Sequence, residues 1–203
     1  MAEFVPIPGE TPIDPSGLID RNIRNRRQLN EAEGKNIAEA VYKYLLGEVT
    51  PEMAPFDFVW SLELHREMFG QVWQWAGKTR QLDLNLGVTW QQVEQKLYSL
   101  FQDLPYWKDM DLVEQAARLH HGAVAIHPFE NGNGRWSRML ANIWLKLHDS
   151  PPTVWPEQAV GETSVIREEY LAAVKAADQM DFAPLIALHK KYTAEDVPET
   201  DDG

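Results

Sequence analysis

The sequence predicts one mostly helical, all-α domain that carries a small β-hairpin. Through most of the 203 residues, apolar side chains recur at three- and four-residue spacing, which is the period of an amphipathic helix. Only residues 80–88 alternate polar and apolar side chains with the two-residue period of a strand. The chain shows no internal repeat and no linker between domains, and its length suits a single hydrophobic core.

The helical periodicity predicts a series of segments separated by turn-forming residues. Gly47 and Gly70 end the first two segments, as glycine commonly does after a helix. Pro105 ends the third, because proline removes a helical hydrogen bond. The expected helices span residues 28–46, 58–69, 89–103, 111–126, 135–147 and 165–177, and a last helix is capped by Asp181 and holds Leu185, Ile186 and Leu188.

The two ends of the chain differ in composition from this helical part. Residues 1–27 are rich in proline and are expected to form an extended arm on the surface or on a partner. Residues 193–203 are acidic and poor in apolar side chains, which predicts a disordered tail. Residues 28–192 between them form the predicted folded domain.

The composition excludes several classes of function. The net charge is −12, whereas a protein that binds the phosphate backbone of nucleic acid should be basic, so we expect no direct nucleic acid binding. No stretch approaches the ~20 apolar residues of a membrane span, and the N-terminus lacks the basic and apolar regions of a signal peptide. The absence of cysteine excludes disulfides and thiolate chemistry and fits a reducing, cytoplasmic location.

The stretch from His127 to Arg138 organises the rest of the chain. One helical run ends before it, and a second amphipathic helix follows Gly132 and Gly134. A glycine-rich loop that opens into a helix N-terminus favours an anion, because free N–H groups and the helix dipole lie there. Arg135 and Arg138 are three residues apart and can both bind phosphate oxygens. His127 at the edge of the loop is a candidate general base.

The same string, HPFENGNGRWSR, resembles the signature HPFx(D/E)GNGRxxR of the Fic (Fic/DOC) family. The resemblance implies a Fic-type helical bundle and a bacterial protein adenylyltransferase, which transfers AMP from its substrate ATP to a Ser, Thr or Tyr hydroxyl of a target protein. It implies that His127 takes the hydroxyl proton, that Phe129 points into the core and that the Asn133 side chain contacts phosphate. The residues implied to bind the nucleotide are Gly132, Asn133, Gly134, Arg135 and Arg138.

One position departs from this signature. Asn131 stands where the family carries Asp or Glu, the residue implied to hold Mg²⁺. Mg²⁺ prefers anionic oxygens, and an Asn carbonyl brings no charge, so Asn131 supports this cofactor only in part. His120 and His121 have no metal-ligand partner four residues away and are interpreted as packing or surface residues.

Residues 29–34, LNEAEG, resemble the inhibitory motif (S/T)xxxE(G/N) of many Fic proteins, with Leu29 where Ser or Thr is expected. The resemblance implies that Glu33 pairs with Arg138 and blocks the γ-phosphate of ATP. The alternative is that Glu33 is an ordinary exposed side chain. Gly34 costs the helix about 1 kcal/mol relative to alanine, which suggests close packing or close approach there. The arm and this helix are most similar to the Fic subfamily called mobile mystery protein B.

Residues 80–88 follow a WAGxxR run and resemble the flap by which Fic proteins hold a target segment through strand addition. The residues implied to contact the target are Arg80, Leu82, Leu84 and Leu86. The alternative is a plain hairpin that covers the core.

Two other functions stay open at this point. One is a Fic-fold regulatory or binding module of a toxin–antitoxin-like pair, with weak or no transferase activity, which Asn131 and the partial inhibitory motif favour. The other is transfer of phosphate or phosphocholine, which Gly132 disfavours because the relatives implied to perform it carry Ala there. The partners that these functions allow are a hydroxyl-bearing target protein, a second copy of this chain and a small regulatory protein.

Overall fold

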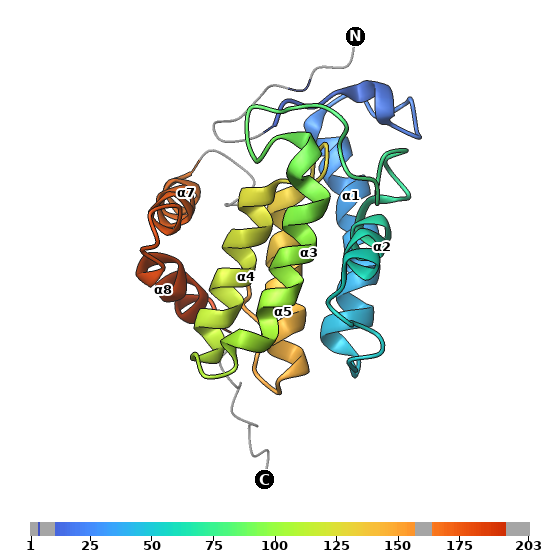
Figure 1. The fold of residues 1–203 in the computed structure, drawn as a ribbon. Coiled ribbons are helices and arrows are strands. Elements are labelled where there is room, and N and C mark those ends of the chain that lie inside the picture. Colours follow the sequence, from blue (N-terminus) through green and yellow to red (C-terminus); the bar gives the residue numbers. More distant parts are fainter. Residues whose placement is uncertain (1–3, 5–10, 157–163, 194–203) are drawn as a thin grey trace.

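The computed structural model describes residue 4, residues 11–156 and residues 164–193, and it is built almost entirely from helices (Figure 1). The helices are α1 Arg26–Val41, α2 Phe58–Phe69, α3 Val93–Asp103, α4 Leu112–Ile126, α5 Asn133–Leu147, α7 Val165–Ala177 and α8 Ala183–Lys191. Short 3₁₀ turns cover Pro15–Gly17, Trp90–Gln92 and Leu104–Trp107, and a π-helical turn, Tyr42–Leu46, extends α1. The expectation of a mostly helical fold is confirmed.

Helices α4 and α5 form the centre of the bundle and pack side by side, joined by the loop 127–132. Helix α3 lies along α4, the pair α1 and α2 lies on one side of this centre, and the pair α7 and α8 lies on the other (Figure 1). The loop 127–132 is at the same end of the bundle as the segment that precedes α1 (Figure 1). The fold therefore places the N-terminal arm beside the signature loop.

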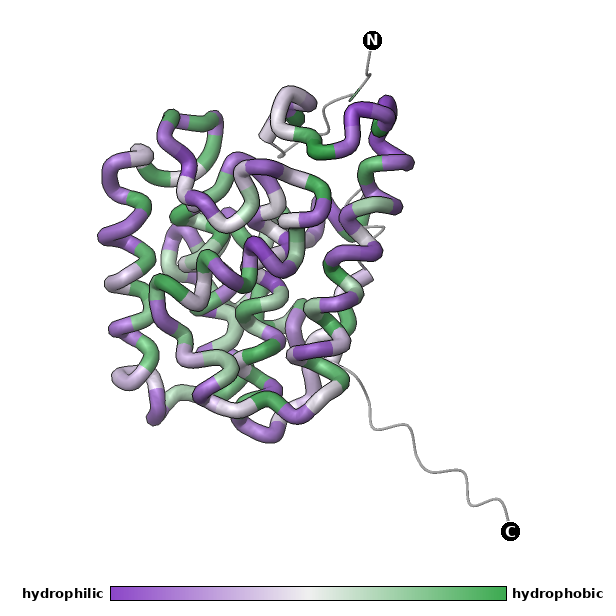
Figure 2. The backbone as a smooth tube through the Cα atoms, turned by 90° about the vertical axis from the view of Figure 1, so that its right-hand side faces the viewer, coloured by the Kyte–Doolittle hydropathy of each residue, from purple (hydrophilic) through white to green (hydrophobic). Residues whose placement is uncertain are grey.

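The apolar faces of these helices enclose the core. Figure 2 shows hydrophobic and hydrophilic residues alternating along the helices, as amphipathic helices require. The main cluster has members in all of the helices from α1 through α5, and it contains the fully buried side chains Phe69, Phe129 and Trp136. A second cluster includes Tyr170 and Leu185 and fastens α7 and α8 to α4.

Capping side chains decide where the helices begin. They satisfy N–H groups that have no partner within the helix. Asn25 accepts a hydrogen bond from the Gln28 N–H at 3.0 Å, and Asp57 accepts one from the Trp60 N–H at 2.7 Å. Helix α1 therefore begins at Arg26, two residues before the position expected from its apolar spacing.

Residues 80–88 differ from the predicted hairpin, because they form an irregular loop in which no residue is in a strand. The Arg80 guanidinium is buried inside this loop and donates to the carbonyls of Leu82 at 2.8 Å, His127 at 2.7 Å and Val88. Carbonyls that a hairpin would pair across its strands are thus bonded to a side chain instead. Leu82 is 74% exposed, so the alternating pattern does not mark a buried face.

The described part of the arm is fastened to the segment that follows α2. The Ile19 N–H donates to the Val72 carbonyl at 2.9 Å, and the Gln74 N–H donates to the Gly17 carbonyl at 3.0 Å. These bonds hold the arm against the bundle close to the site described below.

Several expectations fall outside the described residues, namely those on residues 1–3 and 5–10 of the arm and 194–203 of the tail. The division of the chain into arm, domain and tail stays a prediction. In the part of the chain that the structure describes, no helix combines the length and the apolar composition that crossing a membrane would take.

Candidate functional site

A cavity of about 1580 Å³ lies where α1, α5 and α7 meet the loop 127–132. It gathers most of the residues that the sequence singled out: Glu33, Leu86, His127, Asn131, Gly132, Asn133, Gly134, Arg135 and Arg138. Of the residues predicted to contact a target, Arg80, Leu82 and Leu84 stand outside its lining. The fold thus brings the predicted base, the anion site and the inhibitory glutamate to one place.

The loop 127–132 is braced by the side chain of Asn133. Its Oδ1 accepts a hydrogen bond from the Phe129 N–H at 2.9 Å, and its Nδ2 donates to the Phe129 carbonyl at 2.8 Å. Both groups of the amide are therefore bonded to the backbone, which gives this side chain a bracing role, and the phosphate contact implied for it stays a prediction. Phe129 itself is fully buried, as the sequence interpretation expected.

His65 of α2 supports the same loop, although nothing in the sequence singled it out. Its ring stacks on Phe129 with 3.6 Å between the ring centroids. Nδ1 accepts a hydrogen bond from the Gly77 N–H at 3.0 Å, so Nε2 carries the proton and donates to the Asn131 carbonyl at 3.2 Å. Burial lowers the pKa of His65 to about 3, which keeps the ring neutral, as this bonding pattern requires.

The N-terminus of α5 forms the floor of the predicted anion site. Its first N–H groups have no partner within the helix, and the residues that bear them line the cavity. Gly132 precedes the helix with a φ of 78°, a left-handed conformation that favours glycine. A Cβ at this position would lie 2.7 Å from the Phe69 ring. The free amides and the helix dipole can therefore receive a phosphate group at close range.

His127 ends α4 in a left-handed conformation, with φ 54° and ψ 61°. Its Nε2 lies 3.0 Å from the hydroxyl oxygen of Thr11. Burial lowers the pKa of His127 to about 4, a hydrogen bond with the backbone of Val124 opposes this shift, and the positive charge of Arg80 adds to it. The imidazole is therefore neutral at pH 7 and has a lone pair available to a hydroxyl proton.

The loop 80–88 covers one side of His127. Gly87 has a φ of 92°, and a Cβ added there would clash with the Cβ of His127 and lie 2.8 Å from the Ile126 carbonyl oxygen. The Val88 N–H donates to the same carbonyl at 3.4 Å. This close approach needs glycine at position 87, and it fixes the loop against the candidate base.

Glu33 is buried in the cavity wall, which contradicts the interpretation as an exposed side chain. Its Oε2 lies 2.6 Å from Nη1 of Arg135, and its Oε1 accepts a hydrogen bond from the Trp73 indole N–H at 2.7 Å. The predicted pairing of Glu33 with Arg138 is wrong. The guanidinium of Arg138 lies instead over the Tyr170 ring of α7, 5.5 Å from its centroid. The two arginines diverge because one meets α1 and the other meets α7.

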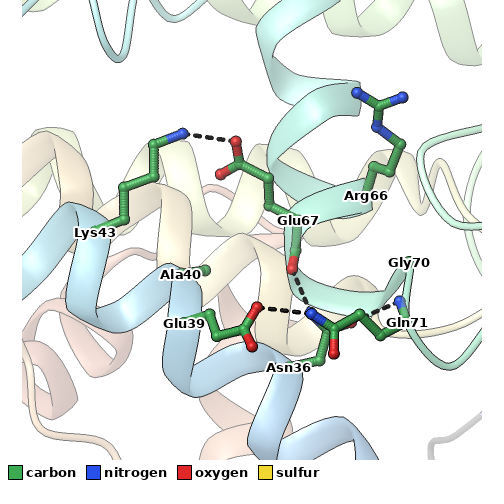
Figure 3. A pocket seen from close by; sticks show the side chains of 8 residues that line it. All are labelled: Asn36, Glu39, Ala40, Lys43, Arg66, Glu67, Gly70 and Gln71. Atoms are coloured by element: carbon green, nitrogen blue, oxygen red, sulfur yellow. Dashed lines mark hydrogen bonds and ion pairs between the residues drawn. The ribbon is translucent and has the colours of Figure 1, made fainter.

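A polar clamp between α1 and α2 fixes the helix that carries Glu33 (Figure 3). Asn36, almost fully buried, donates to the Glu67 carbonyl at 2.7 Å and accepts from the Gln71 N–H at 3.0 Å. Lys43 pairs with the Glu67 carboxylate at 2.6 Å. The clamp lines a separate hollow of about 390 Å³ that holds none of the predicted site residues, so we assign it a structural role.

Gly34 does not serve close packing, one of the two reasons expected from the sequence, and the other, close approach, stays a prediction. A Cβ at this position would meet nothing within 4 Å, and Gly34 lines the cavity. The absence of a side chain here leaves space next to Glu33.

A buried hydrogen-bonded chain of histidines lies next to Arg138. His120 Nδ1 is 3.1 Å from His189 Nε2, and His120 Nε2 is 3.0 Å from the Tyr170 hydroxyl. His189 Nδ1 is 2.8 Å from the Thr153 hydroxyl. Burial lowers the pKa of His189 to about 3 and also lowers that of His120. These rings are neutral packing groups, which agrees with the sequence interpretation of His120.

The residues present fit a protein-held Mg²⁺ poorly. The Asn131 Oδ1 accepts from the Gly132 N–H at 2.7 Å, and its Nδ2 donates to the Thr11 carbonyl at 3.4 Å. Among the described residues, no group of three or more histidine or acidic side chains could hold a metal ion. One neutral oxygen that already accepts a hydrogen bond is a weak ligand for Mg²⁺, so no step below passes through the metal.

Comparison with known proteins identifies the family of part of the chain. Residues 55–145 match the model of the Fic/DOC family, and this span contains the loop 127–132. Residues 55–145 therefore belong to a Fic/DOC domain. Protein adenylyltransferase fic-1 of Caenorhabditis briggsae is 29% identical over 139 residues. Protein adenylyltransferase Fic of Drosophila ananassae is 33% identical over 132 residues.

These relatives extend well beyond the Fic/DOC domain. The matched residues are 65% and 62% of this chain but 26% and 25% of the two relatives, so the chain spans about a quarter of their length. Fic-1 from C. elegans has a TM-score of 0.62 at 25% identity over 86% of this chain and 50% of that one. BepC of Bartonella tribocorum, solved with bound AMPPNP, has a TM-score of 0.65 at 18% identity over 93% and 95%. This last likeness concerns the fold alone.

Three residues of the candidate site were not singled out by the sequence: Thr11, His65 and Trp73. Thr11 and His65 contact the signature loop only through the packing of the arm and α2, and Trp73 contacts Glu33 from the segment that follows α2. The run around Trp73 signalled a change of structure, but neither its spacing nor its composition indicated a partner for Glu33.

Proposed function

We propose that this protein is a protein adenylyltransferase, which moves AMP from ATP to a Ser, Thr or Tyr hydroxyl of a target protein. One observation carries the proposal: a neutral histidine, a free helix N-terminus and two arginines line the same cavity. Its volume of about 1580 Å³ has room for a nucleotide beside part of a target. The relatives named as protein adenylyltransferases support the same activity.

The transfer follows from the positions of these groups. The N-terminus of α5 receives phosphate oxygens, and the acceptor hydroxyl oxygen attacks the α-phosphorus. A new O–P bond forms, the bond from that phosphorus to its bridging oxygen breaks, and pyrophosphate leaves. His127 Nε2 takes the hydroxyl proton, a contribution worth roughly 10²–10⁴-fold in rate. Arg135 and Arg138 stabilise the charge that develops on the departing pyrophosphate.

Glu33 restrains this reaction in the proposed mechanism. Its carboxylate neutralises Arg135 and takes up the contact that a nucleotide phosphate would make. The indole N–H of Trp73 holds the carboxylate in place. Because phosphate must displace an almost fully buried carboxylate, ATP binds in its productive pose only when α1 moves or the pair opens.

The loop 80–88 is the proposed binding surface for the target. Leu82 is 74% exposed and Leu86 is 38% exposed, and apolar side chains exposed close together on one loop favour contact with a partner. Leu84 is half-buried between them. Arg80 acts as a positioning residue, because its guanidinium holds the backbone of the loop against His127.

The proposal is tested with wild type, Glu33→Gly and His127→Ala. Each purified protein is incubated with Mg²⁺ and ATP radiolabelled at the α-phosphate, alone and with a mixture of soluble proteins as acceptors. We expect protein-bound label to be higher in Glu33→Gly than in wild type and to be absent in His127→Ala. Absence of label on every protein, also with the other nucleotides labelled in the same position, would contradict the proposed activity.

A second candidate is a Fic-fold regulatory module with weak or no transferase activity, and one observation favours it. Asn131 supplies no negative charge, and its amide is bonded to Gly132 and Thr11. This candidate predicts that Glu33→Gly binds ATP but transfers nothing, so the same labelling assay, combined with a measurement of ATP binding, separates the two functions.

A further inference from the structure

The N-terminal arm places a hydroxyl group directly on the candidate base. Thr11 is 6% exposed, and its hydroxyl oxygen lies 3.0 Å from Nε2 of His127. The next residue, Pro12, biases Thr11 toward an extended backbone, which is the form in which a segment can lie along another chain segment. Thr11 therefore occupies the position that the proposed mechanism gives to the acceptor hydroxyl.

Contacts on both sides of Thr11 fix this placement. Its own carbonyl accepts a hydrogen bond from the Asn131 side chain at 3.4 Å. Further along the arm, the Gln74 N–H donates to the Gly17 carbonyl at 3.0 Å, and a Cβ on Gly17 would lie 2.6 Å from the Trp75 ring. The arm thus reaches the site as part of the folded chain, so its hydroxyl has a high effective concentration at His127.

Thr11 differs from the other hydroxyl groups of the cavity. Among the described residues that line it, Thr11, Thr153 and Tyr170 carry hydroxyls. The Thr153 hydroxyl lies 2.8 Å from His189, and the Tyr170 hydroxyl lies 3.0 Å from His120. Those two groups belong to the buried histidine chain, whereas the Thr11 hydroxyl contacts the histidine that would accept its proton.

We propose that Thr11 is an acceptor of this site and that the chain adenylylates its own Thr11 in cis. The inference rests on the proposed function. The Thr11 Oγ1 attacks the α-phosphorus of ATP, the O–P bond of a phosphodiester forms, the bond to the pyrophosphate oxygen breaks, and the proton passes to His127 Nε2. ATP supplies the AMP group, so the step needs no other reactant. A modified Thr11 leaves AMP covalently attached to the arm at the mouth of the site.

The test uses the full chain with the Glu33→Gly change, so that the nucleotide side is open. The protein is incubated with Mg²⁺ and α-labelled ATP, and the modified residue is found by mass spectrometry of peptides. We expect AMP on Thr11, loss of that label in Thr11→Val to the background of His127→Ala, and retention at position 11 in Thr11→Ser. Ser16→Ala is the matched control, because Ser16 is an exposed hydroxyl of the same arm bonded to Asp14 at 2.8 Å. Its label should equal that of the parent.

A mixing experiment tests whether the transfer is intramolecular. The catalyst is Glu33→Gly with Thr11→Val, and the acceptor is His127→Ala with an intact Thr11. We expect no AMP on the acceptor chain and a rate of self-labelling in Glu33→Gly that does not change with protein concentration. Label on Thr11 of the acceptor chain would overturn the statement that the reaction occurs in cis.

The remaining outcomes separate this inference from the function on which it rests. AMP on other residues or on other proteins, with an unmodified Thr11, would overturn the assignment of Thr11 and leave the transferase in place. Absence of AMP on every protein would overturn both. Circular dichroism of each variant checks that the arm substitutions leave the helical fold intact.

Discussion

The cavity has a nucleotide half around Arg135 and an acceptor half around His127. In both halves a residue that precedes the signature contacts the site, but the two contacts differ in chemistry. In the nucleotide half, the Glu33 carboxylate pairs with Arg135 at 2.6 Å. In the acceptor half, the Thr11 hydroxyl meets His127 at 3.0 Å. The first contact joins opposite charges and competes with phosphate. The second joins two neutral groups and resembles the start of the proposed reaction.

This difference in chemistry indicates which contact restrains the binding of ATP. A hydrogen bond between neutral groups contributes about 1 kcal/mol net, so the contact of Thr11 with His127 opens readily. A nearly buried carboxylate cannot leave its arginine without cost, because each charge would then lose its partner. We therefore expect the nucleotide half to control whether ATP binds and the acceptor half to control which hydroxyl is modified.

The largest effect should come from Glu33. We predict that Glu33→Gly raises the affinity for ATP by about tenfold or more, which corresponds to about 1.4 kcal/mol per tenfold, because Arg135 becomes available to phosphate. Isothermal titration calorimetry with ATP measures it. Glu39→Gly is the control, since Glu39 is an exposed carboxylate of the same helix that lines the other hollow. Equal affinities in all three proteins would remove Glu33 from the nucleotide half.

In the acceptor half, the burial of His127 should make the stability of the protein depend on pH. Burial holds the pKa of His127 near 4, below its ordinary value of about 6.5. The unfolded chain therefore binds a proton at higher pH than the folded one. The neutral ring therefore contributes fully to the free energy of unfolding above pH 6.5. This contribution is lost as the pH falls toward 4, and the loss is about 3 kcal/mol at most.

We predict that the free energy of unfolding falls less steeply between pH 6.5 and pH 4.5 in His127→Ala than in wild type, as measured by urea denaturation. His65 and His189 also have lowered pKa values, but they contribute to both proteins alike, so the difference isolates His127. His148→Ala, which removes an exposed histidine, is the control. Parallel pH curves for wild type and His127→Ala would contradict the buried, neutral state of the base.

The smallest effect that we expect is on Mg²⁺ binding and comes from Asn131, which lies between the two halves. We predict that Asn131→Asp tightens Mg²⁺ binding in the presence of ATP and raises turnover, because a carboxylate supplies the negative charge that the amide lacks. Mg²⁺ titration of the labelling rate measures both. Asn131→Ser, which also lacks charge, controls for loss of the contact with Thr11. A titration curve unchanged in Asn131→Asp would argue against a metal role for position 131.

The sequence predicted the parts of the fold that local physics decides. Apolar spacing located the helices because each needs one buried face, and the glycines around Asn133 located the loop that starts α5. The family resemblance directed attention to Glu33 and His127, which the structure brings into one cavity. Most of the predicted site residues therefore come from one continuous stretch and one short motif of the sequence.

Contacts between distant segments could not be predicted in the same way. The family resemblance implies Arg138 as the partner of Glu33, whereas the structure pairs Glu33 with Arg135. Which arginine Glu33 meets depends on how α1 crosses α5, and a short sequence motif does not contain that angle. The alternation in residues 80–88 gave no sign that the Arg80 guanidinium would replace cross-strand bonds. Thr11 is an unremarkable residue of a proline-rich arm until the fold places it on His127.

The comparison between the halves is tested most directly by measuring ATP affinity and self-labelling in the same four proteins: wild type, Glu33→Gly, Thr11→Val and the double variant. We predict that Glu33→Gly raises ATP affinity whether or not Thr11 is present. We also predict that Thr11→Val leaves ATP affinity unchanged and abolishes self-labelling in the Glu33→Gly background. Two results would contradict this account: an ATP affinity raised as much by Thr11→Val as by Glu33→Gly, or self-labelling that persists without Thr11. Either would show that Glu33 does not control ATP binding and Thr11 the acceptor position in the way proposed.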